Sequence, residues 1–395
     1  MDEAKIAGEA AGASQRGWRA FSPWGAIGWR IGGKRRLTLR TQAGKVTVEI
    51  DYGQDKESGK WLSSQQQAWG LGAHQKITPL LEDKLAFTVT AAGSYEEAAA
   101  LSAKWGCPVD DSTLHALTQR LGARAEAQTQ KRLEKLPAER EPQRRPSALA
   151  VLELDGWMAR FRGSGWGRKK TVKPRVEWHE IKTGVFYCQE QSARNAGGRG
   201  GLAEKVIVSW QGEPGEIGRR LHWEARRGGL GRAKEALMLS DGSAWIWNLK
   251  RDRWKEAHEL LDFYHGSQHL WRLGEALQGE RQAGDWVKPR LHRLRHGQEK
   301  KVLAEIAELK PPEGEAGKIV REEQGYFRNQ SGRMNYAAIV RRGWPIGSGA
   351  VESACRQKQT RFKRTGQFWK TPGFRHLCSL DEARRNGHWD ALWQN

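Results

Sequence analysis

The chain has 395 residues, a formal net charge of +21 and 38% hydrophobic residues, and it contains 20 tryptophans. This length suits two or three domains, and this hydrophobic content excludes a disordered polybasic tail. The charge favours nucleic acid as the partner, because Lys and Arg displace the counterions condensed on phosphates. An acidic protein or a lipid surface is the alternative that charge alone leaves open.

The cysteines and the N-terminus indicate the compartment. No two cysteines have the Cys-x-x-Cys spacing of a zinc ribbon, and no disulfide framework is indicated. We expect ordinary buried or semi-buried thiols in a reducing cytoplasm. The acidic N-terminus lacks the apolar core of a secretory signal, and no apolar run approaches about 18 residues. We therefore predict a cytoplasmic protein without a membrane span. The cysteines are Cys107, Cys188, Cys355 and Cys378.

The N-terminal part predicts an arm followed by a small β module. Residues 1–35 are rich in Gly, Ala and Trp with weak periodicity, which indicates a flexible arm. Residues 36–76 begin with apolar residues at every second position, which is typical of strands, and residues 41–45 supply a hairpin turn.

Residues 77–130 switch to helical spacing. Ser94 with Glu97 forms a capping box, Gly106 ends that helix, and a second helix begins at Asp111. A helix, a short turn and a helix form the helix-turn-helix arrangement of DNA-binding proteins, although any pair of antiparallel helices shows the same pattern. The predicted DNA contacts are Thr113, His115, Gln119 and Arg120. Residues 131–147, with three prolines, are predicted to be a linker.

From residue 148 onward the pattern indicates an α/β fold. Residues 148–155 and 236–241 are short, nearly continuous apolar runs, the pattern of buried strands. Residues 177–188 and 257–263 add two further candidate strands, and residues 214–227 form an amphipathic helix. The remaining stretch, 265–340, is mainly helical and is cut by Gly279, Pro289 and Pro311.

Three carboxylates stand out against the positive charge. Asp155 and Asp241 each follow an apolar strand, and Glu352 begins a helix after a Gly-Ser-Gly turn. If they meet at one sheet edge, they can hold two Mg²⁺ or Mn²⁺ ions for phosphoryl transfer. Taken singly, each acid is equally explained as a turn residue or as a partner of the helix dipole.

Four segments resemble the transposases of the IS-Kra insertion sequences. They are residues 239–248, 259–271, 344–355 and 361–369. The segments 154–157 and 94–99 also fit, and the similarity extends from about residue 35 to the C-terminus. The resemblance implies an RNase H-like mixed sheet over 148–264, a helical insertion over 265–340, and a catalytic Glu helix with a basic tail over 341–395. It also implies a DDE triad of Asp155, Asp241 and Glu352.

The resemblance extends to neighbouring residues. Asp262 and His265 match the Asp/Cys-x-x-His element of Mutator-like and related transposases, which implies that His265 contacts the scissile phosphate or orders the site; a helix-capping role is the alternative. Arg356 lies four residues after Glu352 and is expected either to bind a phosphate or to brace Glu352. Basic residues that follow are expected to grip phosphates, or else to form a solvated helix face: Lys358, Arg361, Lys363 and Arg364.

One departure from the family concerns zinc. Relatives commonly carry a cysteine-rich zinc ribbon in the N-terminal strand region, whereas residues 51–65 contain no cysteine. We therefore predict no structural zinc, and recognition of DNA ends by strands and basic residues alone.

The predicted function is DNA transposition in the bacterial nucleoid. The enzyme is expected to cleave double-stranded DNA at terminal inverted repeats and to join the 3′-OH to target DNA, as a homodimer that pairs two ends. A DNA-binding regulator without chemistry and an RNase H-like nuclease are the alternatives.

Overall fold

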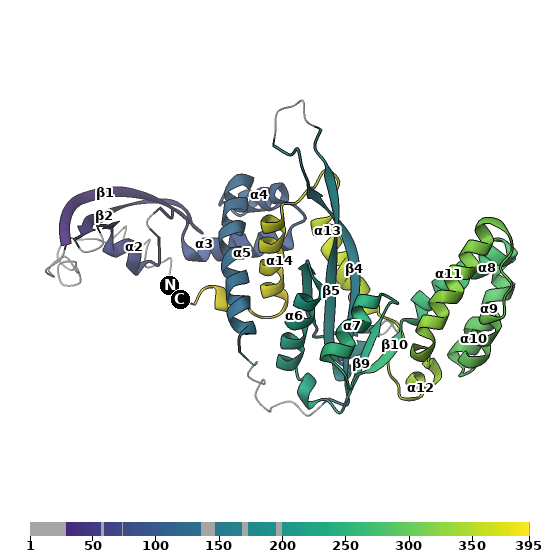
Figure 1. Ribbon diagram of the computed structural model, residues 1–395. Coiled ribbons are helices and arrows are strands. Elements are labelled where there is room, and N and C mark those ends of the chain that lie inside the picture. Colours follow the sequence, from purple (N-terminus) through teal and green to yellow (C-terminus); the bar gives the residue numbers. More distant parts are fainter. Residues whose placement is uncertain are drawn as a thin grey trace. The chain divides into compact units, whose positions relative to one another are not determined.

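The computed structural model describes residues 29–56, 59–72, 74–135, 147–167, 173–194 and 200–394 (Figure 1). The chain divides into two compact units. One consists of Met1–Glu126 with His376–Asn395, and the other is Ala127–Arg375. The last part of the predicted C-terminal segment therefore belongs to the N-terminal unit.

The first unit begins with a three-stranded antiparallel sheet in the order β1-β2-β3. Thr41 pairs with Gly44, so the turn between the first two strands is the predicted hairpin. The first strand begins seven residues before the predicted start of the β module, and residues 1–28 lie outside the described residues. The elements are β1 (Trp29–Thr41), β2 (Gly44–Asp55), β3 (Trp61–Leu62) and the short helix α2 (Ser64–Ala68).

Three helices follow: α3 (Pro79–Ala91), α4 (Tyr95–Lys104) and α5 (Asp111–Leu133). Ser94 caps α4 by accepting a hydrogen bond from the Glu97 amide at 3.0 Å. The Glu97 carboxylate accepts from the Gly93 amide at 2.7 Å, one residue before the position that the capping box predicts. Helix α5 runs beyond residue 130 into the predicted linker, of which residues 136–146 lie outside the described part.

The second unit is built on a five-stranded mixed sheet in the order β10-β9-β4-β5-β8. The strand β5 runs antiparallel to both its neighbours, whereas β4, β9 and β10 are parallel. In chain order the strands are β4 (Leu149–Arg162), β5 (Val176–Cys188), β8 (Val206–Gln211), β9 (Glu235–Ser240) and β10 (His258–Leu261). A separate two-stranded pair is formed by β6 (Ser192–Arg194) and β7 (Gly200–Leu202).

The two faces of this sheet carry different helices. Leu152 and Leu154 of β4 pack in one buried cluster with α6 (Pro214–Arg227) and α7 (Ala244–Arg253). Side chains alternate along a strand, so Glu153 points to the opposite face, where its carboxylate contacts α13 (Gly349–Phe362). The last helix, α14 (Thr371–Arg385), follows α13.

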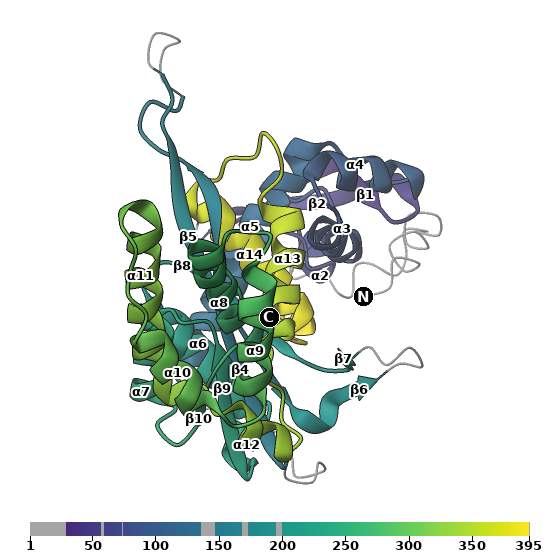
Figure 2. The same cartoon turned by 90° about the vertical axis from the view of Figure 1, so that its right-hand side faces the viewer.

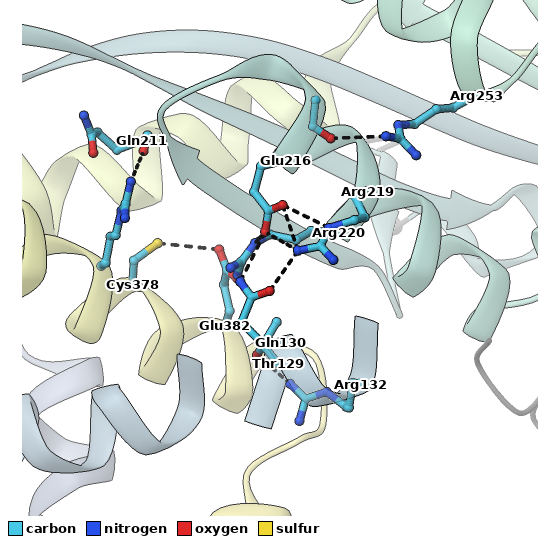
Figure 3. A network of polar contacts seen from close by, with 12 residues as sticks. Thr129, Gln130, Arg132, Gln211, Glu216, Arg219, Arg220, Arg253, Cys378 and Glu382 are labelled. Atoms are coloured by element: carbon cyan, nitrogen blue, oxygen red, sulfur yellow. Dashed lines mark hydrogen bonds and ion pairs between the residues drawn. The ribbon is translucent and has the colours of Figure 1, made fainter. Parts of the chain in front are cut away.

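A polar network fixes the start of α6 (Figure 3). The Glu216 carboxylate accepts hydrogen bonds from Arg219 at 3.0 Å and from Arg220 at 2.7 Å. Gln130, in the last turns of α5, bonds both Glu216 at 3.3 Å and Arg219 at 2.8 Å. These turns of α5 are therefore attached to the outer side of α6.

A group of antiparallel helices lies between β10 and α13, over the stretch predicted to be mainly helical (Figure 2). Pro289 lies inside a helix rather than interrupting the helical stretch. No helix of the described residues is long and apolar enough to cross a membrane. The insertion helices are α8 (Phe263–Gln278), α9 (Ala283–Arg295), α10 (Glu299–Ala307), α11 (Gly314–Gln330) and α12 (Tyr336–Arg341).

Candidate active site

Asp155 and Asp241 lie at corresponding positions of neighbouring strands. The parallel pairing of β4 with β9 ends at Leu154 and Ser240, and each aspartate is the next residue along the chain. Asp155 continues into the longer ladder with β5, where it pairs with Thr183. Asp241 follows β9 as predicted, whereas Asp155 lies inside β4, which continues to Arg162 because it keeps its pairing with β5. The prediction that the first strand ends at Asp155 is therefore wrong, although the two acids lie at corresponding positions of adjacent strands.

Ser240 connects the backbone segments that carry the two acids. Its hydroxyl accepts a hydrogen bond from the Leu154 amide at 2.9 Å, and its carbonyl accepts one from the Asp262 amide at 2.8 Å. Ser240 is fully buried. One serine thus joins the end of β9 and the residue after β10 to the middle of β4.

The environment of Asp155 disfavours its charged form. Burial raises the pKa of this carboxyl, and the nearby charge of Asp241 raises it further. A hydrogen bond from the Gly156 amide at 2.7 Å and the neighbouring His265 act in the opposite direction. Two carboxylates close enough to repel each other provide a place where a cation is favoured.

Asp241 is held by the start of α7. Its two carboxylate oxygens accept hydrogen bonds from the Ser243 amide at 2.9 Å and the Ser243 hydroxyl at 3.0 Å. The next residue, Gly242, has no room for a side chain, because an added Cβ would meet Tyr326 Cε2 at 2.6 Å. Asp241 therefore has a fixed backbone and a side chain oriented by its own turn.

Asp262 joins two helix starts beneath the site. Its Oδ1 accepts a hydrogen bond from the His265 amide at 2.7 Å and caps α8. Its Oδ2 accepts from the Ser348 hydroxyl at 2.6 Å and from the Ser348 amide, at the start of α13. Asp262 is 1% exposed, so its charge is balanced by these donors inside the protein.

Glu153 fixes α13 to the sheet in the same way. Its carboxylate accepts hydrogen bonds from the Val351 amide at 2.8 Å and from the Tyr187 hydroxyl at 3.0 Å. Burial raises the pKa of Glu153 to about 7, against the lowering effect of these two donors. The first turn of α13 is therefore attached both to β4 and to α8.

Glu352 lies in this first turn of α13, as predicted, and it is 44% exposed. Cys355, one turn further on, is hydrogen-bonded to Asp155, and burial with that negative charge raises the pKa of its thiol. Residues three apart share a helix face, so Glu352 lies beside the Asp155 side of α13. Arg356 approaches Glu352 at 3.8 Å and is 82% exposed, which fits either of its predicted roles.

His265 lies within electrostatic reach of Asp155. Its ring centroid is 6.0 Å from that of His269, which stacks on Tyr326 with centroids 3.5 Å apart. His269 is also paired with the buried Glu323 at 2.7 Å. Helices α8 and α11 therefore pack together next to Asp241.

The carboxylates fit a divalent cation in part. Asp155 and Asp241 offer adjacent hard oxygen ligands of the kind that Mg²⁺ and Mn²⁺ prefer. Over the described residues, however, no three His, Cys, Asp or Glu side chains are grouped closely enough to hold a metal ion. Glu352 is therefore near the pair without being assembled with it.

The basic residues after Glu352 divide into two pairs. Lys363 and Arg364 are exposed, which is compatible with phosphate contacts. Lys358 is 1% exposed and Arg361 is 7% exposed, so the prediction that these two grip phosphates conflicts with their burial. The reason is the helix period, which places both on the buried side of α13. Lys358 Nζ lies 6.0 Å from the Phe362 ring centroid.

The residues predicted to read DNA from the helix-turn-helix make contacts inside the first unit. The Thr113 hydroxyl donates to Asp110 at 2.9 Å at the start of α5. Gln119 is hydrogen-bonded to His376 at 2.8 Å, and Arg120 pairs with the buried Glu82. His115 packs edge-on against Tyr95. Their role in DNA binding stays a prediction.

All four cysteines are buried free thiols, as the sequence predicts. Three further residues that the sequence analysis did not single out hold the site together: Glu153, Ser240 and Tyr326. The one available signal was Glu153, a carboxylate inside an otherwise apolar strand. Nothing in the sequence marks Ser240 or Tyr326, because their partners are about 85 residues away along the chain.

Comparison with solved structures gave distant similarities, of which one is described here. The Drosophila P element transposase strand transfer complex has a chain 13% identical in sequence, with 79% of each chain covered and a TM-score of 0.26. No protein-family model matches this chain, and no curated protein matches it.

Proposed function

We propose that the second unit is the RNase H-like catalytic domain of a DDE transposase. The observation that carries the proposal is the pairing of β4 with β9, which brings Asp155 and Asp241 to adjacent positions. Asp155, Asp241 and Glu352 are the catalytic carboxylates, and His265 lies beside them.

The strand order supports this assignment. Numbered along the chain, the five strands are arranged 3-2-1-4-5 with the second strand antiparallel, which is the arrangement expected of an RNase H-like sheet. Asp155 lies inside the first of these strands, Asp241 follows the fourth, and Glu352 lies in the first turn of the helix after the insertion. Neither the charge of +21 nor the fold alone assigns the chemistry, so the proposal depends on the site.

Asp155 and Asp241 would hold Mg²⁺ or Mn²⁺, with Glu352 as the third ligand. Two bound ions would supply Lewis acids for the attacking and leaving oxygens of the phosphate. The protein's own contribution is orientation. Ser240 and Asp262 fix the segments that carry the acids, and Gly156 and Ser243 donate hydrogen bonds that hold the two aspartate side chains.

The proposed reaction has two steps on double-stranded DNA. Water attacks the phosphodiester at the end of the element, the P–O3′ bond breaks, and a free 3′-OH is released. That 3′-OH then attacks a phosphodiester of the target DNA, so one bond forms for each bond that breaks. The enzyme acts as a homodimer in this proposal, because two ends have to be joined.

The test uses the DNA that flanks this gene. A labelled duplex carrying its inverted repeats is incubated with the full-length protein and Mg²⁺, together with a supercoiled target. A transposase gives strand-transfer products joined to the target. A nuclease gives nicked ends without joined products, and a regulator gives a bound complex without any cleavage. Either of the last two results contradicts the proposal.

A further inference from the structure

Beyond the five-stranded sheet, β4 and β5 continue as a two-stranded arm (Figure 1). The pairing of β4 with β9 ends at Leu154, and the pairing of β5 with β8 ends at Ile181. Residues 156–162 and 176–180 pair only with each other and, at Phe161, with Trp369.

One face of the arm is buried. Trp157 and Phe161 pack with Phe362 and Phe374, with ring centroids 5.4 to 6.4 Å apart. Asp155 belongs to the same face by the alternation of side chains. The aromatic residues on this side are therefore core, and they leave the other face of the arm for solvent.

The outer face of the arm combines exposed apolar side chains with cations. Trp178 is 53% exposed, and Met158 and Val176 are each 39% exposed. Arg160, directly opposite Trp178 in the ladder, has its guanidinium 6.0 Å from the Trp178 ring centroid. Lys363, from the loop after α13, has its ammonium 5.8 Å from the same ring.

A second aromatic and cation group adjoins the first. Arg160 also lies 5.1 Å from the Phe368 ring, and Phe368 packs on Trp166 with centroids 4.9 Å apart. Arg162 lies 5.3 Å from the Trp166 ring. The carboxylate on this face, Glu180, is paired with Lys182 at 2.8 Å. We call Arg160, Arg162, Trp166, Trp178, Lys363 and Phe368 the arm patch.

The chemistry of the arm patch selects a polyanion with accessible flat rings. Three cations match phosphates, and a half-exposed indole offers a stacking surface to any base. In a duplex the base faces are covered by their neighbours, so only an unpaired strand presents both groups at once. A lipid surface or an acidic peptide would satisfy the cations but would leave Trp178 without a stacking partner.

We propose that the arm patch binds an unpaired DNA strand, with a base stacked on Trp178 and phosphates held by Arg160 and Lys363. The proposal rests on the proposed function for its choice of DNA, but the surface lies on the face of β4 away from Asp155. It assigns the arm a binding role that is separate from the catalytic carboxylates.

The experiment compares two substitutions of one residue. Trp178→Leu keeps an apolar side chain without a stacking ring, and Trp178→Phe keeps a ring. Binding of the full-length protein to a fluorescein-labelled oligothymidylate of about 15 nucleotides is measured by anisotropy in EDTA. We expect Trp178→Leu to weaken this binding roughly five- to a hundredfold and Trp178→Phe to weaken it much less. Met158→Ala, on the same face, is the control and should bind as the unsubstituted protein does.

Binding of a blunt duplex of the same length is measured in the same way. The affinity of the protein for this duplex should not change in Trp178→Leu. The substitutions Arg160→Gln and Lys363→Gln should each reduce the salt dependence for the single strand, by about 0.7 in the slope of log K against log salt. Photocrosslinking with 5-iodouracil in the same oligonucleotide should modify Trp178.

Two results would overturn the proposal: unchanged oligothymidylate binding in Trp178→Leu, or an equal loss for the duplex, which would indicate phosphate contacts alone. Because EDTA prevents cleavage, this outcome is independent of the catalytic proposal. A protein that cleaves DNA but binds the strand normally in Trp178→Leu contradicts only the arm patch. A protein that loses strand binding in Trp178→Leu but never cleaves contradicts only the transposase.

Discussion

The hydroxyl of Ser240 accepts a hydrogen bond from the backbone amide of Leu154 at 2.9 Å, in the buried junction between β9 and β4. Each of these residues directly precedes a candidate metal ligand. The bond therefore links the positions of Asp155 and Asp241, which lie next along the two strands.

Ser240→Ala removes this acceptor and leaves the buried Leu154 amide without it. We expect the free energy of unfolding to fall by about 1–3 kcal/mol. Since the two aspartates lose a shared anchor, Mn²⁺ affinity measured by electron paramagnetic resonance should also fall. Ser353→Ala, which removes a more exposed hydroxyl on α13, is the control and should change neither quantity. Equal Mn²⁺ affinity in Ser240→Ala would contradict the positioning role.

Substitutions of Asp262 test the connection between the starts of α8 and α13. Asp262→Ala removes the acceptor for the His265 amide and for Ser348, so we expect a loss of about 2–4 kcal/mol in unfolding free energy and a strong loss of cleavage. Asp262→Asn retains one acceptor oxygen and should lose less in both assays. The control is Asp252→Ala, whose carboxylate is largely exposed. If Asp262→Ala and Asp252→Ala proved equally stable, α13 would not depend on this contact.

A substitution at Gly242 tests whether the close packing of α11 against the residue after Asp241 is needed. Gly242→Ala places a Cβ 2.6 Å from Tyr326 Cε2 and 3.0 Å from Gln330 Nε2. Overpacking of this kind costs about 1–3 kcal/mol in stability, and it should displace Asp241 and reduce cleavage. Gly349→Ala is the matched control, because an added Cβ there meets nothing within 4 Å. Urea unfolding of both variants decides the point; an effect of equal size would argue against the close contact.

Because of the raised pKa of Glu153, we predict that the free energy of unfolding depends on pH. Burial raises the pKa of this carboxyl from its ordinary 4.5 to about 7 in the folded protein. The folded state therefore binds the proton more tightly than the unfolded state. The resulting stabilisation is complete below the unfolded-state pKa and is lost as the pH rises through the folded-state pKa.

The variant Glu153→Gln lacks this titration. Between about pH 5 and about pH 8, its free energy of unfolding should fall less steeply with pH than that of the unsubstituted protein. Urea titrations of both proteins across this range provide the measurement. Parallel pH profiles would show that Glu153 titrates in the same way in the folded and unfolded states.

Much of the fold follows from local patterns in the sequence. The helix over 214–227 has the predicted bounds, because its apolar face repeats with the helical period. Strands β4 and β9 follow from short apolar runs that end at Asp155 and Asp241, but the continuation of β4 to Arg162 has no apolar run to mark it. The strand β8 has no such signal, because only its central residues are buried and its pattern is short.

The structural features that the sequence does not predict depend on contacts between distant parts of the chain. A run of basic residues after Glu352 does not reveal which side of α13 faces the protein, and the packing of α13 buries Lys358 and Arg361. Gln119 and Arg120 have polar partners at His376 and Glu82, which no local pattern indicates. Glu153 and Asp262 attach the start of α13 through buried hydrogen bonds, which no local pattern indicates.

The most direct test of the central claim is cleavage of a labelled inverted-repeat duplex by three proteins in Mg²⁺. The unsubstituted chain should nick the DNA, and Asp155→Asn and Asp241→Asn should each lose at least about 100-fold in rate while still binding the duplex. This estimate follows because even residues that only orient metal ligands contribute about 10- to 100-fold. Full cleavage by either variant would contradict the assignment of these two carboxylates as the catalytic centre.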